Sequence, residues 1–331
     1  MSNEPISRLD IAAKIIPGNF LRQTGIFWAF LVLCIVMAIS QPAFLTVPNI
    51  TNILKQISIN GILAVGMTLV LISGGIDLSV GSIVAVSCVA SAYFAGADST
   101  YPIIIPFLVA LAVGGFLGAI NGVGIAYFGL APFIMTLAML TMARGLVLLV
   151  TNARPIFNLT RPFINVSNTF FLGLPNLIWY FLIVLIIGHI LLGKTVFGKW
   201  TYAVGGNEAA TRLSGVDVKR VKFILYSICG ALAGLAGLLL ASRITSGNPR
   251  VGDGYELDAI AAAVIGGVSM AGGSGSILGV LIGVLILGVI QNGFDILGLS
   301  TFYQQIMKGV IILFAVLVDI RAKKNIKSRL S

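Results

Sequence analysis

The chain has 331 residues, of which 58% are hydrophobic and only 10% are charged, and its mean hydropathy is +1.04. A soluble domain carries about 25% charged residues, which is enough to cover a surface in water. This composition argues against a soluble enzyme, a nucleic-acid-binding protein and a disordered scaffold. It predicts that a lipid bilayer surrounds most of the chain, and no nucleic acid partner is expected despite the net charge of +10.

Long charge-free runs divide the sequence into membrane-spanning helices. A helix crosses a hydrocarbon core of about 30 Å with about 20 mostly apolar residues, and clusters of Pro, Gly and Asn mark the loops between spans. We therefore expect an all-α, polytopic integral membrane helix bundle. About ten transmembrane helices are expected, at residues 24–41, 57–73, 79–96, 103–125, 131–150, 176–193, 223–241, 257–271, 275–291 and 303–320.

Lysine and arginine gather on one side of this arrangement. With ten spans both termini lie on the same side, and that side receives 14 of the basic residues against five in the opposite loops. Cytoplasmic loops retain Lys and Arg, so both termini are predicted to be cytoplasmic. We expect one transmembrane domain over residues 1–331, with a cytoplasmic tail at 1–23, a cytoplasmic loop at 194–222 and a basic cytoplasmic tail at 321–331.

The sequence offers no catalytic or metal-binding pattern. Its cysteines, Cys34, Cys88 and Cys229, fall inside apolar spans, which favours free thiols, and the single histidine, His189, lies near the end of a span. Residues 188–195 match a P-loop, but the run is bulky and ends a membrane span, which favours coincidence. We expect no enzyme activity, no metal and no cofactor bound by this chain.

Two glycine-rich segments, residues 72–83 and 265–277, echo each other. Each joins two spans through Gly-Gly and resumes with Gly-Ser-Ile. Transporters are often built from repeated halves, with broken helices near the midplane where unwound backbone meets a polar solute. We expect weakly repeated halves with a broken or re-entrant element at these segments; two ordinary glycine turns are the alternative.

Glycines also recur at every fourth position within three spans. They are Gly114, Gly118 and Gly122, then Gly230 and Gly234, then Gly275, Gly279 and Gly283. Small residues at this spacing line one helix face and let a neighbouring backbone approach closely. The pattern predicts tight packing between helices.

Three long motifs carry a resemblance to a known family. The runs at 74–82, 254–267 and 204–216 are similar to the ribose-type permease subunits of bacterial ABC sugar importers, in the branched-chain amino acid/ribose-type permease family. The resemblance implies a permease of the bacterial cytoplasmic (inner) membrane that forms the pathway for a monosaccharide or similar small polyol. It also implies three partners: a second permease subunit in a homodimer or heterodimer, a sugar-type ABC ATPase that holds ATP and Mg, and a periplasmic substrate-binding protein.

The loop at 194–222 is expected to carry a short helix over 207–213. Asn207 can cap it, Glu208 lies in its first turn, Arg212 follows Glu208 by four residues, and Gly215 stops it. The resemblance assigns ATPase docking to this segment, although a solvated loop with ordinary cytoplasmic charges is the alternative. The expected coupling residues are Gly206, Asn207, Glu208, Ala209, Ala210, Arg212, Ser214 and Gly215.

Polar residues at membrane depth are candidates for the translocation pathway. Uncharged groups can hydrogen-bond hydroxyls without trapping an ion, and charges at depth are expensive and usually functional. The candidates are Gln56, Asn60, Asp77, Asn121, Thr136, Asp258 and Asn292. For each of them a helix–helix hydrogen bond is the alternative role. Arg144 and Lys308 lie nearer helix ends and are expected to extend toward the interface.

The loops opposite the cytoplasmic side carry charges against the positive-inside trend. Such charges would steer an acidic binding protein into place, or they are simply solvated. The candidate docking residues are Arg154, Arg161, Arg243, Arg250, Asp253 and Glu256. A second hypothesis for the whole chain is an ion-coupled secondary transporter of a small solute, which would use acids in the bundle and need no ATPase.

Overall fold

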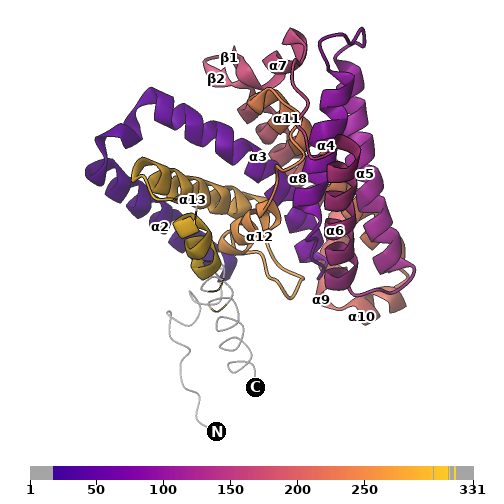
Figure 1. Ribbon diagram of the computed structural model, residues 1–331. Helices are drawn as coiled ribbons and strands as arrows, with labels where there is room; N and C mark the ends of the chain where they lie inside the picture. Colours follow the sequence, from indigo (N-terminus) through magenta and orange to yellow (C-terminus); the bar gives the residue numbers. More distant parts are fainter. Residues whose placement is uncertain (1–17, 301, 312, 314–316, 318–331) are drawn as a thin grey trace, which may run out of the picture.

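The computed structural model describes residues 18–300, 302–311, 313 and 317, so the expected tails lie largely outside the described residues. The described chain is almost entirely helical (Figure 1). The helices are α2 (Gly18–Ser40), α3 (Val47–Ile72), α4 (Val80–Phe94), α5 (Ile104–Ala126), α6 (Pro132–Thr151), α7 (Arg161–Asn168), α8 (Asn176–Lys194), α9 (Val196–Gly206), α10 (Glu208–Leu213), α11 (Val218–Ile244), α12 (Tyr255–Ile265) and α13 (Ile277–Ile296). A 3-10 turn, η1 (Pro42–Leu45), and an antiparallel hairpin of β1 (Phe170–Phe171) and β2 (Leu174–Pro175) complete the named elements, and residues 302–311 are also helical.

Six of the described helices are long and apolar enough to cross a membrane: α3, α5, α6, α8, α11 and α13. Two shorter apolar helices are the Gly25–Ser40 part of α2 and α4. Large apolar side chains on α6, including Phe133, Ile134 and Leu149, are exposed, as expected of a surface that faces lipid. The structure is therefore a polytopic membrane helix bundle, as predicted, while the number of ten spans stays a prediction.

Five named helices, α2, α3, α11, α12 and α13, have an end that differs from the expected one by three or more residues. α3 begins at Val47 rather than at residue 57, because Pro48 stands in its first turn, where proline favours a helix start. Lys55, which had suggested a loop, lies over the ring of Phe170 at 5.5 Å from the ring centroid. The expected span at 257–271 is a helix of only 11 residues, since a Gly-rich segment ends it, whereas α4 agrees with the expected 79–96 within two residues.

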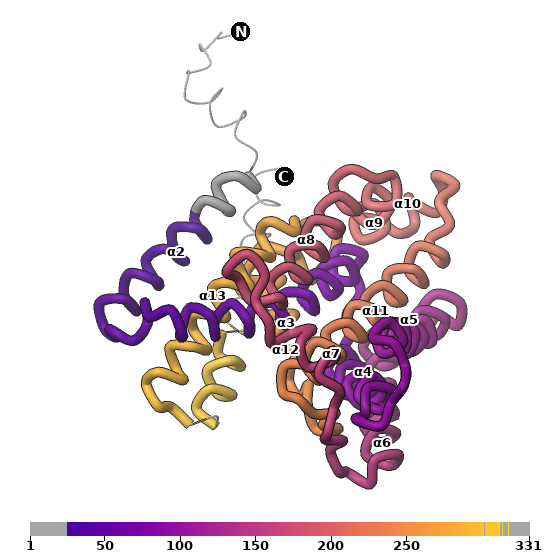
Figure 2. The backbone as a smooth tube through the Cα atoms, turned by 90° about the horizontal axis from the view of Figure 1, so that it is seen from above, coloured from indigo at the N-terminus to yellow at the C-terminus, as the bar shows by residue number. Residues whose placement is uncertain are grey.

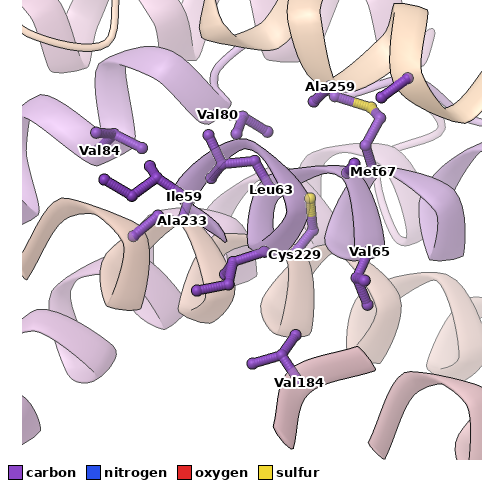
Figure 3. Close-up of a cluster of buried hydrophobic side chains, with 14 of the residues drawn as sticks. Ile59, Leu63, Val65, Met67, Val80, Val84, Val184, Cys229, Ala233 and Ala259 are labelled. Carbon is purple, nitrogen blue, oxygen red and sulfur yellow. The ribbon is translucent and has the colours of Figure 1, made fainter. Parts of the chain in front are cut away.

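The core forms around α3, whose second half is buried on all sides. Figure 3 shows Leu63 and Met67 of this helix among side chains from α4, α8, α11 and α12. Figure 2 shows α2 and α13 on one side of this centre and α5 and α6 on the other. α3 is thus the element against which the two sides of the molecule pack.

α5 and α11 pack backbone to backbone in antiparallel directions. Gly114 and Gly118 of α5 face Gly234 and Gly230 of α11, and a Cβ atom at Gly118 would overlap the carbonyl oxygen of Tyr226. Gly122 continues the series against the backbone of Phe223. The four-residue glycine spacing predicted this close packing, and the structure confirms it.

α11 also defines two ends of the molecule. Its 27 residues correspond to about 40 Å of helix, enough to cross a bilayer. Its first turn adjoins α10, whereas Ser242 in its last turn donates a hydrogen bond to the carbonyl of Phe163 in α7 at 2.7 Å. Figure 1 shows α9 and α10 at one end of the bundle and α7 with the β-hairpin at the other. We call these the α10 end and the α7 end.

We expect Gly118→Ala to destabilise the protein by about 1–3 kcal/mol, the usual cost of overpacking a filled contact. Gly115→Ala is the matched control, because a Cβ there meets Ala231 at an ordinary 3.6 Å. Thermal unfolding of the purified protein in detergent measures both. Equal melting temperatures for the two variants would contradict the close α5–α11 contact.

Candidate functional site

The short helix predicted within residues 194–222 is present as α10. Asn207 caps it, since its side-chain oxygen accepts a hydrogen bond from the backbone N–H of Ala210 at 3.0 Å. α9 precedes it directly, so the two helices form one connected segment between α8 and α11. The backbone after Leu213 turns at Gly215, which has a φ of +85°, a value that favours glycine.

Glu208 ties α10 to the start of α11. Its carboxylate lies 2.6 Å from the Lys222 ammonium and 2.9 Å from the Arg212 guanidinium. These groups hold the pKa of the Glu208 carboxyl below its usual range, mainly through the hydrogen bond from Lys222. The carboxylate is therefore ionised at neutral pH, and the bridge is lost only when acidification reaches the lowered pKa.

The remaining expected coupling residues form an exposed surface at the α10 end. Gly206, Asn207, Ala209, Ala210, Arg212, Ser214 and Gly215 are exposed, whereas Glu208 is half-buried. A cavity of about 480 Å³ lies beside this surface, between the α5–α6 loop, α10 and the first turns of α11. The exposed backbone and small side chains offer a contact surface, while the Glu208 carboxylate is engaged by Lys222 and Arg212.

Two short helices, α4 and α12, begin side by side, and we call them the interrupted helices because a Gly-rich segment adjoins each of them. α4 starts beside the segment 246–254, because Gly252 packs against Gly81, and Gly247 packs farther along α4 against Ala92. α4 then runs to the α7 end, where Gly96 pairs with Leu159. α12 runs the other way and ends at the glycine segment near α9. The glycine segments therefore connect α3 to α4 and α12 to α13, an arrangement that a broken element and an ordinary glycine turn would both produce.

Asp77 lies in the loop between α3 and α4 and is fully buried. One carboxylate oxygen accepts hydrogen bonds from the Ser79 backbone at 2.9 Å, from the Ser79 hydroxyl at 2.6 Å and from the Asn121 amide at 3.5 Å. Asn121 also donates to the Ser79 hydroxyl oxygen at 2.8 Å, and Tyr226 donates to the Ile76 carbonyl at 3.2 Å. The other carboxylate oxygen has no partner among the described residues.

A second polar cluster lies between α3, α12, α13 and the helical residues 302–311. The Gln56 amide donates to Gln291 at 2.9 Å, and Lys308 forms an ion pair with Asp258 at 2.9 Å. Nearer the start of α3, Asn49 and Asn292 exchange two hydrogen bonds of 3.0 and 2.7 Å. These interactions join the outer part of α3 to the last helices of the chain.

The expected pathway residues thus fall into two clusters and two isolated positions. Asp77 and Asn121 meet in one cluster, while Gln56, Asp258 and Asn292 belong to the second region. Thr136 is buried, and its hydroxyl donates to the Pro132 carbonyl of its own helix at 2.8 Å. Asn60 is half-buried, and its side-chain amide has no hydrogen-bond partner within the described part of the chain.

The expectation that Arg144 and Lys308 merely extend to the interface was wrong. Arg144 donates to the backbone carbonyls of Pro249 and Val251 at 3.1 and 2.8 Å. It therefore satisfies backbone groups of the unwound segment before α12, which have no helix partner. Lys308 neutralises the carboxylate of Asp258, which is 5% exposed.

Sequence reasoning missed five polar participants: Asn49, Ser79, Tyr226, Gln291 and Lys308. Ser79 stood two residues after an expected site residue, a spacing at which Asp binds the following backbone. Asn49 and Gln291 lie near expected spans but pair only across distant parts of the chain. Within the described residues, no group of three or more His, Cys, Asp or Glu side chains is placed to hold a metal ion.

The charged loops gather at or near the α7 end. Ile156 and Gly247 exchange two backbone hydrogen bonds of 2.9 and 2.8 Å, which tie the loop after α6 to the loop after α11. Of the expected docking residues, Arg154, Arg161, Arg250 and Asp253 are exposed, whereas Arg243 and Glu256 are half-buried. Glu256 lies deeper than the others, beside Gly81 at the start of α4.

We expect Asp77→Ala to lower stability by about 1–3 kcal/mol, because it leaves buried donors of Ser79 unsatisfied. Asp77→Asn keeps an acceptor of the same size in the same place, so it should retain most of the stability. Thermal unfolding in detergent separates the two variants. An alanine variant that melts with the wild type would contradict the Asp77–Ser79–Asn121 arrangement.

Comparison with known proteins agrees with the resemblance in the motifs. Residues 49–316 match the family described as the permease component of branched-chain amino acid transport systems. The chain is 45% identical over 304 residues to the ribose import permease protein RbsC of Escherichia coli (strain K12), covering 88% of this chain and 91% of that protein. It is 46% identical over 303 residues to RbsC of Bacillus subtilis (strain 168), covering 90% and 93%, respectively.

A third relative, the L-arabinose ABC transporter permease protein AraH of Azospirillum brasilense, is 40% identical over 301 residues, which cover 91% of this chain and 88% of that protein. No solved structure matches the chain. The family match includes both interrupted helices and the α9–α10 segment, so the described geometry lies within the family's shared region. The chain therefore belongs to the permease family of branched-chain amino acid transport systems, among relatives that are import permeases of ABC transporters.

Proposed function

We propose that this chain is the transmembrane permease of an ATP-driven importer and forms the translocation pathway for a monosaccharide or similar small polyol. The observation that carries the proposal is the 40–46% identity, over nearly the whole chain, to permeases named for ribose and L-arabinose. Relatives that are permeases of ABC transporters work with an ATPase, whereas an ion-coupled secondary transporter needs none. The same relationship therefore disfavours the secondary transporter. The chain is a transport subunit rather than an enzyme.

The protein is a multi-pass protein of the bacterial cytoplasmic membrane, and we infer that its α10 end faces the cytoplasm. Six basic residues lie between 194 and 222 at this end, and cytoplasmic loops retain such residues. This orientation makes residues 194–222 a cytoplasmic coupling loop within a single permease domain of residues 1–331. The tails at 1–23 and 321–331 are proposed to be cytoplasmic for the same reason.

Three partners complete the proposed importer. A separate sugar-type ABC ATPase binds ATP and Mg and hydrolyses the ATP. A periplasmic protein delivers the solute, and a second permease, identical or different, shares the pathway. The apolar composition of this chain is expected to place most of it in the membrane, which leaves only short segments outside for binding soluble partners. This supports assigning ATP hydrolysis and solute delivery to other chains. In this proposal ATP and Mg bind to the ATPase and not to this chain.

The ATPase is proposed to dock on the exposed surface of α10. Ala209, Ala210 and Arg212 are exposed there, and a cavity lies next to them. Glu208 acts differently, because its carboxylate is already engaged by Lys222 and Arg212. It is a positioning residue that fixes the angle of α10 against α11.

The solute pathway is proposed to follow the interrupted helices. Unwound backbone at membrane depth occurs where protein or a polar cavity surrounds it, and such breaks are where transporters meet polar solutes. Asp77 and Asn121 lie beside the start of α4, and Asp258 lies in the first turn of α12. Gln56, Asn60, Thr136 and Asn292 remain candidate contacts farther along the pathway.

The binding protein is proposed to dock at the α7 end through exposed arginines. Arg154, Arg161 and Arg250 are free to meet an acidic surface and would mainly raise the association rate. Arg243 is half-buried, and Asp253 and Glu256 lie toward the start of α12, so these three would act at the inner margin of the dock.

Reconstitution in proteoliposomes with the ATPase and the binding protein tests the function. Uptake of labelled D-ribose or L-arabinose should require ATP and both partners and should continue after ion gradients are collapsed. Uptake that needs an ion gradient and proceeds without ATP would contradict the proposal and support the secondary transporter.

A double-mutant cycle tests the role of Glu208. If Glu208 positions α10 through Lys222, then Glu208→Gln and Lys222→Gln should each weaken ATPase binding by about two- to fivefold, in keeping with a partly exposed ion pair of up to about 1 kcal/mol. The double variant should be no weaker than either single variant, because both remove the same interaction. Quantitative co-purification of the ATPase provides the measurement.

Arg212→Gln is a positive comparison, since Arg212 is 61% exposed on the proposed docking surface; it should weaken ATPase binding whether or not Lys222 is present. A direct ATPase contact by Glu208 predicts a different result, in which Lys222→Gln binds normally and only Glu208→Gln is impaired.

A further inference from the structure

Three backbone segments that are distant in sequence meet at the α10 end without intervening side chains. They are the end of α3 with Gly74, the end of α9 at Gly205 and Gly206, and the loop between α12 and α13 at Gly272 and Gly273. We call this meeting point the glycine junction. It brings the proposed coupling segment into contact with the connections of both interrupted helices.

The contacts at the junction leave no room for a side chain at Gly205. A Cβ atom there would overlap the carbonyl oxygen of Ile72 and would lie 2.7 Å from the backbone nitrogen of Gly273. Gly272 packs on Gly205 from the other side and has a φ of +84°, so it also depends on the absence of a Cβ. The backbones therefore transmit displacement directly, with no flexible side chain between them.

Two hydrogen bonds fasten the same segments. The Gly273 N–H donates to the Ile72 carbonyl at 2.8 Å, which joins the two glycine loops to each other. The hydroxyl of Tyr202, on α9, donates to the Gly275 carbonyl at 2.9 Å. α9 is thus held to the second loop by a side chain and to both loops by close backbone contact.

Each loop leads into one of the polar clusters. The loop after α3 carries Asp77, which binds Ser79 and approaches Asn121. The loop after Gly266 follows α12, which carries Asp258 and its ion pair with Lys308. A displacement of α9 at the junction therefore reaches both halves of the proposed pathway at once.

We propose that Gly205 and Tyr202 are positioning residues for transport, through which movement of the α9–α10 segment is passed to the two interrupted helices. This inference rests on the proposed function, because it assumes that an ATPase moves α10. Neither residue touches the ATPase surface or the solute in this proposal. Their role is to keep α9 in register with the loops at 73–79 and 266–276.

The chain offers a matched control in Gly193, a helical glycine of α8 that lies outside the junction and outside the proposed coupling residues. A Cβ at Gly193 would meet nothing within 4 Å, so Gly193→Ala makes the same substitution without disturbing the junction. Tyr202→Phe removes the hydroxyl that binds Gly275 and adds no atoms. The three variants therefore separate overpacking, loss of a hydrogen bond and simple substitution.

The experiment measures sugar uptake per ATP hydrolysed in proteoliposomes that contain the complete importer. Loss of one buried hydrogen bond between neutral groups typically corresponds to about a fivefold effect, so Tyr202→Phe should lower this ratio about two- to fivefold. Gly205→Ala should lower it at least about tenfold, as overpacking costs more, and Gly193→Ala should leave it unchanged. Loss of stability alone would lower uptake and hydrolysis together and keep the ratio constant.

An unchanged ratio in Gly205→Ala and Tyr202→Phe would overturn the inference, as would an equal fall in Gly193→Ala. If Gly205→Ala does not fold, the Tyr202→Phe ratio decides: a lower ratio supports the junction and an unchanged one overturns it. Failure of the proposed function itself is recognised separately, because the wild-type importer would then show no ATP-dependent sugar uptake.

Discussion

Buried backbone groups of a membrane protein cannot reach water, so a carbonyl or N–H left unpaired where a helix ends must find a partner within the protein. This constraint explains contacts that otherwise look unrelated. The carbonyl of Ile72 accepts from Gly273, the carbonyl of Ile76 accepts from Tyr226, and the carbonyls of Pro249 and Val251 accept from Arg144. Each of these partners comes from a distant part of the chain, and together they stabilise the unwound segments that begin α4 and α12.

Glycine supplies the second requirement, which is close approach of helices in a solvent that gives no hydrophobic driving force for their association. Gly118 lets α5 lie against the backbone of α11, and Gly283 lets α13 lie against the carbonyl of Ala262 in α12. These contacts differ in their consequences. The α5–α11 pair is a continuous contact between two long helices and forms a rigid frame, whereas the α12–α13 pair includes an interrupted helix whose ends meet loops.

The sequence was sufficient for the helical class, for most long spans and for the capped helix α10, because these depend on local composition and on neighbours three or four residues apart. It predicted α5, α6 and α8 within about two residues, the margin within which helix ends are defined. It could not place α12 correctly, since the end of that helix depends on backbone contacts with α13. The sequence also did not predict the partners of Asp258 and Arg144. Lys308 lies 50 residues from Asp258, and Pro249 lies 105 residues from Arg144.

In the proposed importer, α10 has two connections with opposite mechanical roles. Through Glu208 and Lys222 it is attached to α11, which belongs to the rigid frame with α5. Through α9 and Gly205 it touches the loops of the interrupted helices, which are held by a few hydrogen bonds and close backbone contacts. The α5–α11 contact is already closely packed, so a movement of α10 cannot be absorbed there. In this proposal it instead displaces the two loops of the interrupted helices relative to the α5–α11 frame. That displacement would open or close the path of a polar solute.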